Sequence, residues 1–155
     1  MNKKSLILFL ALAILHCKKS YIFTEIDAGF KSLDDVFVAE FKGQPKAVGK
    51  NEELPLNAAT AMTGRYGTTL SLDVWEFGSE NESRQAYETL VSAEKANAPR
   101  EYDQTKSGEY RYMCVRASGV TGEIFTVKKL LFRFLAENKD TIREYLTASK
   151  LARVK

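Results

Sequence analysis

Cysteine and histidine, the side chains that most often supply nucleophiles, general bases and metal ligands, are scarce in this chain. The 155 residues include two cysteines, Cys17 and Cys114, and a single histidine, His16. His16 and Cys17 stand side by side behind an unbroken apolar run at residues 6–15, which itself follows two lysines. The chemistry available to this protein therefore depends first on what that N-terminal segment is.

The apolar run is too short to cross a bilayer. Ten residues rising 1.5 Å each in a helix cover only about half of a 30 Å hydrocarbon core. A short apolar run behind a positively charged start is typical of a secretory signal peptide, which is removed after export. No later stretch of the sequence approaches 18 apolar residues. The sequence therefore predicts an exported protein with no second membrane-spanning segment.

The four residues Ile14-Leu15-His16-Cys17 resemble the lipobox of bacterial lipoproteins, in the loose form typical of spirochaetes. The Cys-Lys-Lys start that follows is also similar to that of small bacterial lipoproteins. The resemblance implies that a diacyl lipid, palmitate included, is attached to the Cys17 thiol and that the chain is cut just before it. The family prefers small residues where Leu15 and His16 stand. The alternative is an ordinary signal peptide cut near Ala11 or Ala13.

This interpretation divides the chain into a signal peptide at 1–16, a lipidated cysteine and tether at 17–34, and one domain at 35–155. The resemblance places the mature protein in the bacterial envelope, on the outer membrane rather than the inner one, with the membrane as its partner through the lipid. Removing 16 of the 155 residues leaves enough chain for one domain with a sizeable core.

The mature chain lacks several common catalytic arrangements. It contains no histidine, so Ser-His-Asp and Cys-His nucleophiles are excluded. With Cys17 lipidated, Cys114 is the only free thiol, which excludes a disulfide and a zinc site. Loss of two lysines leaves basic residues almost balanced by the 20 acidic ones, which gives no reason to expect nucleic-acid binding. We expect no cofactor and no metal.

One short motif resembles a known catalytic pattern. Ser92-Ala93-Glu94-Lys95 has the S-x-x-K form of penicillin-binding serine enzymes, and the later Lys106-Ser107-Gly108 is similar to their K-[ST]-G element. That resemblance would make Ser92 the nucleophile and Lys95 its base. However, no S-x-N stands between the two elements, and the domain is far smaller than that family's fold. We therefore expect Ser92 and Lys95 on the exposed side of a helix.

Cys114 lies in a predicted strand at 109–117, where alternation places it on one face with Arg116 and Tyr112. A cysteine among such neighbours is typically a small buried hydrophobe. The alternative is a thiol activated by Arg116. Several aromatic residues could likewise line a pocket for a small apolar ligand, although in a domain of this size they are more typical of a core: Tyr66, Trp75, Phe77, Tyr110 and Tyr112.

Two elements are clearly indicated. Residues 68–77 alternate as a strand that has Leu70, Leu72 and Val74 on one face and Trp75 and Phe77 on the other. A helix over 80–97 begins at a capping box formed by Ser79 and Glu82, carries an apolar stripe at helical spacing, and ends before Pro99.

The remaining elements follow from local pattern. We expect a strand at 36–42, a loop at 43–55, a weak helix at 56–66, a polar loop at 97–108, a helix capped at Asn138 or Asp140, and a frayed end at 150–155. Residues 123–136 fit either a helix or a hairpin turning at Lys128-Lys129, and the β-branched and aromatic content favours the hairpin.

The order of elements predicts a single α+β domain with a mainly antiparallel sheet and helices packed on one face. The function we expect is that of a non-enzymatic envelope lipoprotein that binds a ligand or protein partner on its sheet. Two alternatives stay open. One is a small hydrolase or thiol-dependent enzyme that uses carboxylates or Cys114, and the other is a surface adhesin or host-interacting antigen.

Overall fold

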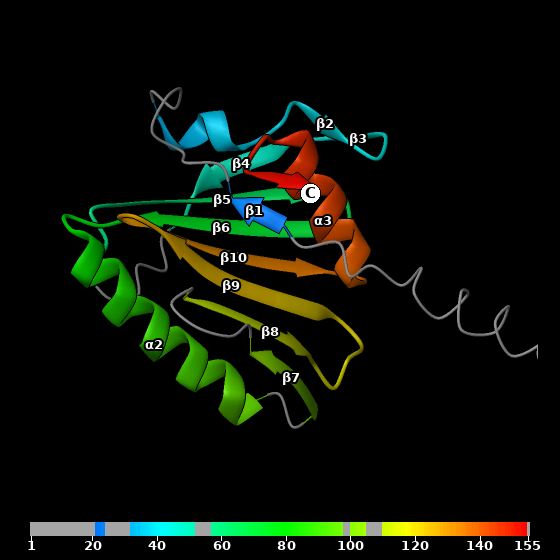
Figure 1. Ribbon diagram of the computed structural model, residues 1–155. Coiled ribbons are helices and arrows are strands. Elements are labelled where there is room, and N and C mark those ends of the chain that lie inside the picture. The colour runs from blue at the N-terminus through cyan, green and yellow to red at the C-terminus, as the bar shows by residue number, and fades with distance from the viewer. Residues whose placement is uncertain (1–20, 24–31, 52–56, 98–99, 105–109, 155) are drawn as a thin grey trace, which may run out of the picture.

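The computed structural model describes residues 21–23, 32–51, 57–97, 100–104 and 110–154. Its main element is a seven-stranded sheet in the order β4-β5-β6-β10-β9-β8-β7, in which every neighbouring pair is antiparallel (Figure 1). The strands are β4 (Ala47–Lys50), β5 (Thr60–Tyr66), β6 (Leu70–Glu76), β7 (Arg100–Gln104), β8 (Arg111–Val115), β9 (Thr121–Val127) and β10 (Leu130–Ala136). The predicted α+β class with an antiparallel sheet is confirmed.

The two helices pack on opposite faces of this sheet, not on one face as the sequence suggested. Leu70, Leu72 and Val74 of β6 form one hydrophobic core with α3 (Lys139–Ala148). Trp75, the next residue of β6, belongs to a second core with α2 (Glu80–Asn97). Successive strand residues point to opposite sides of the sheet. We call the side that packs against α3 the α3 face and the side that packs against α2 the α2 face.

The predicted capping box of α2 is confirmed. The Ser79 hydroxyl accepts a hydrogen bond from the backbone N–H of Glu82 at 3.2 Å, and the Glu82 carboxylate accepts one from the backbone N–H of Ser79 at 3.1 Å. Ala86 and Val91 of the helix are buried against the sheet. Ser83 fixes the start of α2 to the β9–β10 turn, because its hydroxyl donates to the carbonyl of Lys128 at 2.6 Å.

The α3 face is covered by several short elements as well as α3. Asn138 caps α3 by accepting from the backbone N–H of Thr141 at 2.9 Å, as predicted. A 3-10 turn, η2 (Leu33–Val36), and a hairpin of β2 (Glu40–Phe41) and β3 (Gln44–Pro45) lie on the same face. The hairpin turn uses positive φ at Lys42 and Gly43, as a tight two-residue turn requires.

Three N-terminal predictions are wrong. The expected strand at 36–42 is the end of η2 followed by β2, because Ser32 and Asp35 form a capping box that starts a turn before the alternating residues. The expected loop at 43–55 contains β3 and β4. The expected weak helix at 56–66 is the strand β5, whose residues point alternately to the two faces and pair with β6 along its whole length.

Two further predictions are corrected. The polar loop at 97–108 contains β7, an edge strand, where polar residues are tolerated because one side faces water. The C-terminal residues do not fray within 150–154, since β11 (Ala152–Val154) pairs with β1 (Tyr21–Phe23) in a separate two-stranded ribbon. β1 lies within the segment 17–34 that the sequence assigned to a tether. The hairpin at 123–136 is confirmed as β9 and β10, and the strand at 68–77 as β6.

Candidate functional site

A polar cluster occupies the centre of the α2 face. Asp73 of β6 lies opposite Thr63 of β5 and Arg133 of β10 in the strand register. Residues that are directly opposite in neighbouring strands share a face and bring their side chains within contact. Three adjacent strands therefore place an acid, a hydroxyl and a guanidinium side by side. Asn51, just after β4, completes what we call the Asp73 cluster: Asn51, Thr63, Asp73 and Arg133.

Asp73 is the acceptor at the centre of this cluster. Its Oδ1 accepts from Thr63 Oγ1 at 2.6 Å and from Asn51 Nδ2 at 3.4 Å. Its Oδ2 accepts from Arg133 Nε at 2.8 Å and lies 2.7 Å from Arg133 Nη2. Asp73 is only 4% exposed. The carboxylate is thus fully engaged within the protein, as a buried charge must be, and is itself unavailable to a ligand.

Arg133 is held differently. Its side chain is 23% exposed, and its guanidinium lies over the Trp75 ring, 5.4 Å from the ring centre. In the part of the chain that the structure describes, its Nη1 makes no hydrogen bond. The Nε1–H of Trp75 is buried and has no hydrogen-bond acceptor among the same residues. A guanidinium fixed by a carboxylate and an aromatic ring, with donors left over, is preorganised to bind an acceptor.

The surroundings of Arg133 on the α2 face are polar and open. The next row of the sheet places Arg65, Ser71 and Leu135 opposite one another, of which Arg65 is exposed and the other two are half-buried. Arg65 makes no ion pair with any described residue. The area therefore offers two guanidinium groups and two hydroxyls, with Asp73 as the only acid of these two rows and already paired. This composition suits a carboxylate, phosphate or carbonyl group.

A second ion pair, on the α3 face, is closed to solvent. Glu123 is completely buried and pairs with Arg111, which is almost as buried. Burial raises the pKa of Glu123 above its ordinary value, and the charges of Arg111, Lys139 and Arg143 act in the opposite direction. The Oε2 oxygen of Glu123 has no hydrogen-bond donor among the described residues. Because both side chains are buried, this pair fits a structural role beneath α3.

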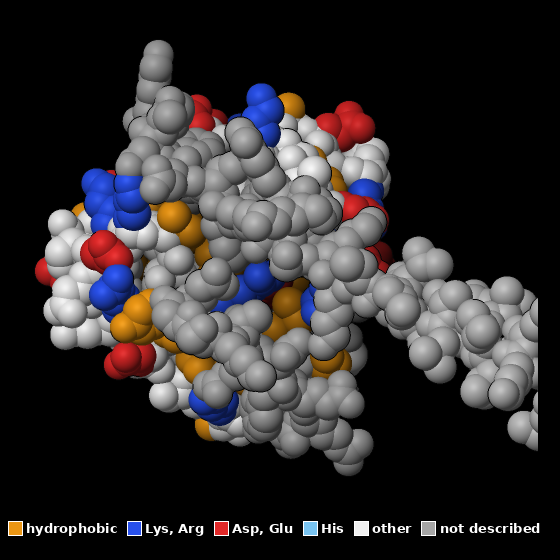
Figure 2. Space-filling model, in the orientation of Figure 1, with side chains coloured by type: hydrophobic (Ala, Val, Ile, Leu, Met, Phe, Trp, Pro, Cys, Tyr) orange, Lys and Arg blue, Asp and Glu red, His pale blue; other side chains and the backbone are white. Residues whose placement is uncertain are grey.

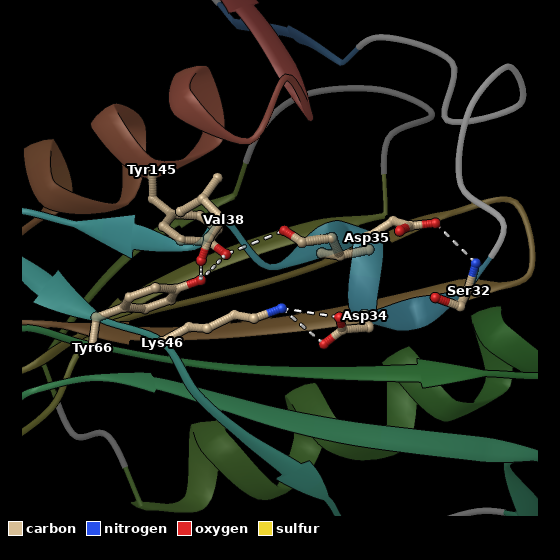
Figure 3. Close-up of polar contacts among 8 residues, drawn as sticks. Ser32, Asp34, Asp35, Val38, Lys46, Tyr66 and Tyr145 are labelled. Atoms are coloured by element: carbon tan, nitrogen blue, oxygen red, sulfur yellow. Dashed lines mark hydrogen bonds and ion pairs between the residues drawn. The ribbon is translucent and has the colours of Figure 1, made fainter.

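A pair of buried tyrosines joins the N-terminal segment to the core of the α3 face (Figure 3). The hydroxyls of Tyr66 and Tyr145 lie 2.9 Å apart. Tyr66 donates to the carbonyl of Val38 at 2.8 Å and Tyr145 to that of Val36 at 3.2 Å. Burial raises the pKa of both phenols, which keeps them protonated donors. Lys46 and Asp34, paired at 2.9 Å, flank this contact. The tyrosines therefore hold the segment in place and are not exposed for chemistry.

Cys114 is buried under α2, as the sequence predicts. Burial raises the pKa of its thiol, and the neighbouring Glu94 carboxylate adds to this, while Arg116 opposes it. Arg116 is itself engaged by Glu94, whose Oε2 accepts from its Nε at 3.1 Å. Arg116 and Tyr112 lie near Cys114, as predicted. However, burial outweighs the charge of Arg116 and raises the pKa of the thiol.

The S-x-x-K residues lie apart from any site. Ser92 is exposed, and its hydroxyl donates to the carbonyl of Glu88 within α2 at 2.8 Å. Lys95 is exposed and lies 5.7 Å from the centre of the Tyr112 ring. The later element 106–108 falls outside the described residues, as do Cys17 and the rest of the lipobox. Of the predicted pocket aromatics, Tyr66, Trp75, Phe77 and Tyr112 are buried in the two cores and Tyr110 is half-buried.

Local sequence patterns did not predict the Asp73 cluster, although a signal was present. Asp73 stands at the centre of the apolar strand LSLDVWE, and Arg133 at the centre of LLFRFLA. A single charge of opposite sign in the middle of each of two apolar strands indicates a buried pair. What the sequence could not supply was the register that places the two strands side by side.

Among the described residues that are visible in Figure 2, charged side chains of both signs are scattered and form no single dominant patch. Among the described residues, no group of acidic, cysteine or histidine side chains could hold a metal ion, and no helix has the length and apolar character needed to cross a membrane. Comparison with protein-family models, curated proteins and solved structures finds no match to this chain.

Proposed function

We propose that this chain is an exported lipoprotein of the bacterial envelope whose domain is a non-enzymatic binding module. In this proposal a lipid on Cys17 anchors the domain to the membrane, on the outer membrane rather than the inner one. The α2 face then binds a ligand or protein partner through a carboxylate, phosphate or carbonyl group. The observation that carries the binding role is the preorganised, part-exposed guanidinium of Arg133, held by Asp73 and by the ring of Trp75.

The anchor rests on the sequence alone. The apolar run at 6–15 ends directly before His16 and Cys17, which is the order that signal peptidase and lipid attachment require in the family that it resembles. The binding role rests on the groups that remain after the most buried charges have paired within the fold. The pairs Asp73–Arg133, Glu123–Arg111 and Glu94–Arg116 use the most buried charges for structure.

The enzyme alternatives gain no support from these contacts. A thiol-dependent reaction requires a thiolate, whereas burial raises the pKa of Cys114. A glycoside hydrolase uses two acids placed about 5–10 Å apart around its substrate, whereas the two buried acids Asp73 and Glu123 lie on opposite faces of the sheet.

The anchor is tested by the mass and the location of the mature protein. We expect protein extracted from the membrane to lack residues 1–16 and to carry the mass of a diacylglyceryl group on Cys17. Cys17→Ser should move the protein to the soluble fraction. Cys114→Ser is the matched control and should leave it in the membrane. A Cys17→Ser protein that remains in the membrane with its N-terminus uncut would show an uncleaved anchor instead.

A further inference from the structure

The ribbon of β1 and β11 fixes where the chain leaves the domain. Tyr21 pairs with Val154, Ile22 with Arg153 and Phe23 with Ala152. Leu151, which directly precedes β11, is buried in the core of the α3 face, and β11 contacts α3. The N-terminal strand is therefore attached to the α3 side of the molecule through its pairing with the C-terminal strand. Figure 1 shows β1 close to α3 and the chain end.

Only four peptide units separate Cys17 from Tyr21. A fully extended chain covers at most about 3.3–3.6 Å per residue, so their Cα atoms are no more than about 14 Å apart. If Cys17 carries the lipid, as the proposed function holds, this bound keeps the start of β1 close to the bilayer surface. α2 lies across the sheet from α3, and packed layers are spaced by about 10 Å. α2 is therefore farther from the anchor.

Basic residues stand next to the ribbon in the sequence. Arg153 lies at the centre of β11, and Lys150, just before it, is exposed. In the sequence, Lys18 and Lys19 stand between the lipid attachment point and β1. Basic residues close to a bilayer are attracted by anionic headgroups, at about 1 kcal/mol for each lysine or arginine. Within α3 the basic residues Lys139 and Arg143 are balanced by Asp140 and Glu144, so tether length is what decides the side of the domain.

We propose that the anchored domain rests with its α3 side, including the β1–β11 ribbon, on the surface of a bilayer with anionic headgroups. The α2 face and Arg133 then point away from the membrane. This orientation rests on the proposed lipid anchor. It adds which surface contacts the membrane and which is presented to other molecules.

The test compares two fluorescent probes at alanines that are exposed on the two sides. Ala148 lies in the last turn of α3 and Ala96 in the last turn of α2. Each is replaced separately, as Ala148→Cys and Ala96→Cys, in the full chain and labelled with bimane after extraction. Cys114 is buried and Cys17 holds the lipid as a thioether, so unsubstituted protein serves as the labelling control. The labelled proteins are placed in phosphatidylcholine–phosphatidylglycerol vesicles that contain a headgroup quencher.

We expect bimane at position 148 to lose most of its fluorescence to the headgroup quencher and bimane at position 96 to keep its own. Replacing Lys150 and Arg153 by glutamate should reduce the quenching at 148. Equal quenching at the two positions, in protein whose lipid mass has been confirmed, would overturn the orientation while leaving the anchor intact. Protein without lipid mass would contradict the anchor itself, and the orientation with it.

Discussion

The two faces of the seven-stranded sheet are built from the same strands but differ in how completely they are covered. The α3 face is closed by α3, η2 and the β2–β3 hairpin, and its central residues Leu72, Val74 and Phe134 have no exposed surface. On the α2 face, one helix covers the strands on the β8–β10 side. In the row of Arg65, Ser71 and Leu135, the first residue is exposed and the other two are half-buried.

This difference separates structural polar groups from available ones. On the closed face, the Glu123–Arg111 pair and the Tyr66–Tyr145 pair are buried, and their hydrogen bonds hold elements together. On the α2 face, the buried carboxylate of Asp73 is likewise fully hydrogen-bonded within the protein. The Arg133 side chain, in contrast, is partly exposed and its Nη1 makes no hydrogen bond with a described residue. A buried ion pair is weak evidence for function by itself. A fixed guanidinium that keeps part of its surface exposed is better evidence, because little further ordering is needed on binding.

The largest expected contrast is between two leucines on neighbouring strands. Leu72 is fully buried on the α3 face, and Leu72→Ala should cost about 2–5 kcal/mol of unfolding free energy. Leu135 is half-buried on the α2 face, and Leu135→Ala should cost about 1 kcal/mol of unfolding free energy. Full burial of a leucine side chain contributes roughly 1.5–3 kcal/mol. Denaturant unfolding of the two variants measures both. Equal losses would mean that the α2 face is as closed as the other.

A smaller contrast uses two glycines in adjacent strands. A Cβ at Gly64, on the α3 face, would clash with the Phe37 ring, so Gly64→Ala should cost about 1–3 kcal/mol. Nothing lies within 4 Å of a Cβ at Gly49. Gly49→Ala should be neutral or stabilising by up to about 1 kcal/mol, because alanine restricts the unfolded chain. Thermal or denaturant melts compare them, and a stable Gly64→Ala protein would show that Phe37 does not close this face.

The smallest expected effect concerns Cys114, the one thiol of the described residues. Burial raises the pKa of this thiol, so at a given alkaline pH a smaller fraction of it is ionised in the folded protein than in the unfolded chain. Alkylation should be slow without denaturant and fast with it, and Arg116→Gln should not change the folded-state rate. Rapid native labelling that is lost in Arg116→Gln would make a thiol-based activity the first alternative to test.

Local patterns predicted the elements whose signals are local. The Ser79–Glu82 capping box, the alternation of Leu70, Leu72 and Trp75, and the Asn138 cap all stand as expected. The strand β5 was missed because the alanines at 58, 59 and 61 give residues 56–66 a weak helical character, although Thr60 and Thr63 favour a strand. It is a strand because it pairs with β6 over all seven residues, a long-range effect that overrides weak propensity.

The candidate site depended on contacts that sequence patterns do not contain. Asp73 and Arg133 are 60 residues apart, and their ion pair follows from the register of β6 against β10. The division of the helices between two faces was likewise missed, because an apolar stripe shows that a helix packs but not on which side of the sheet. The ribbon of β1 and β11 joins the two ends of the domain, which no local pattern indicates.

The binding role of the α2 face is tested most directly by the side-chain N–H signals of Trp75 and Arg133 in NMR. Trp75 is the only tryptophan of the chain, so its indole signal needs no further assignment. We expect both signals to shift saturably during titration of the Cys17→Ser protein with inorganic phosphate at constant ionic strength. Arg65→Ala should weaken the response, while Arg84→Ala, which removes an exposed arginine from α2, should not. Unchanged Trp75 and Arg133 signals, or an equal shift of the Arg143 signal on the α3 face, would contradict the account.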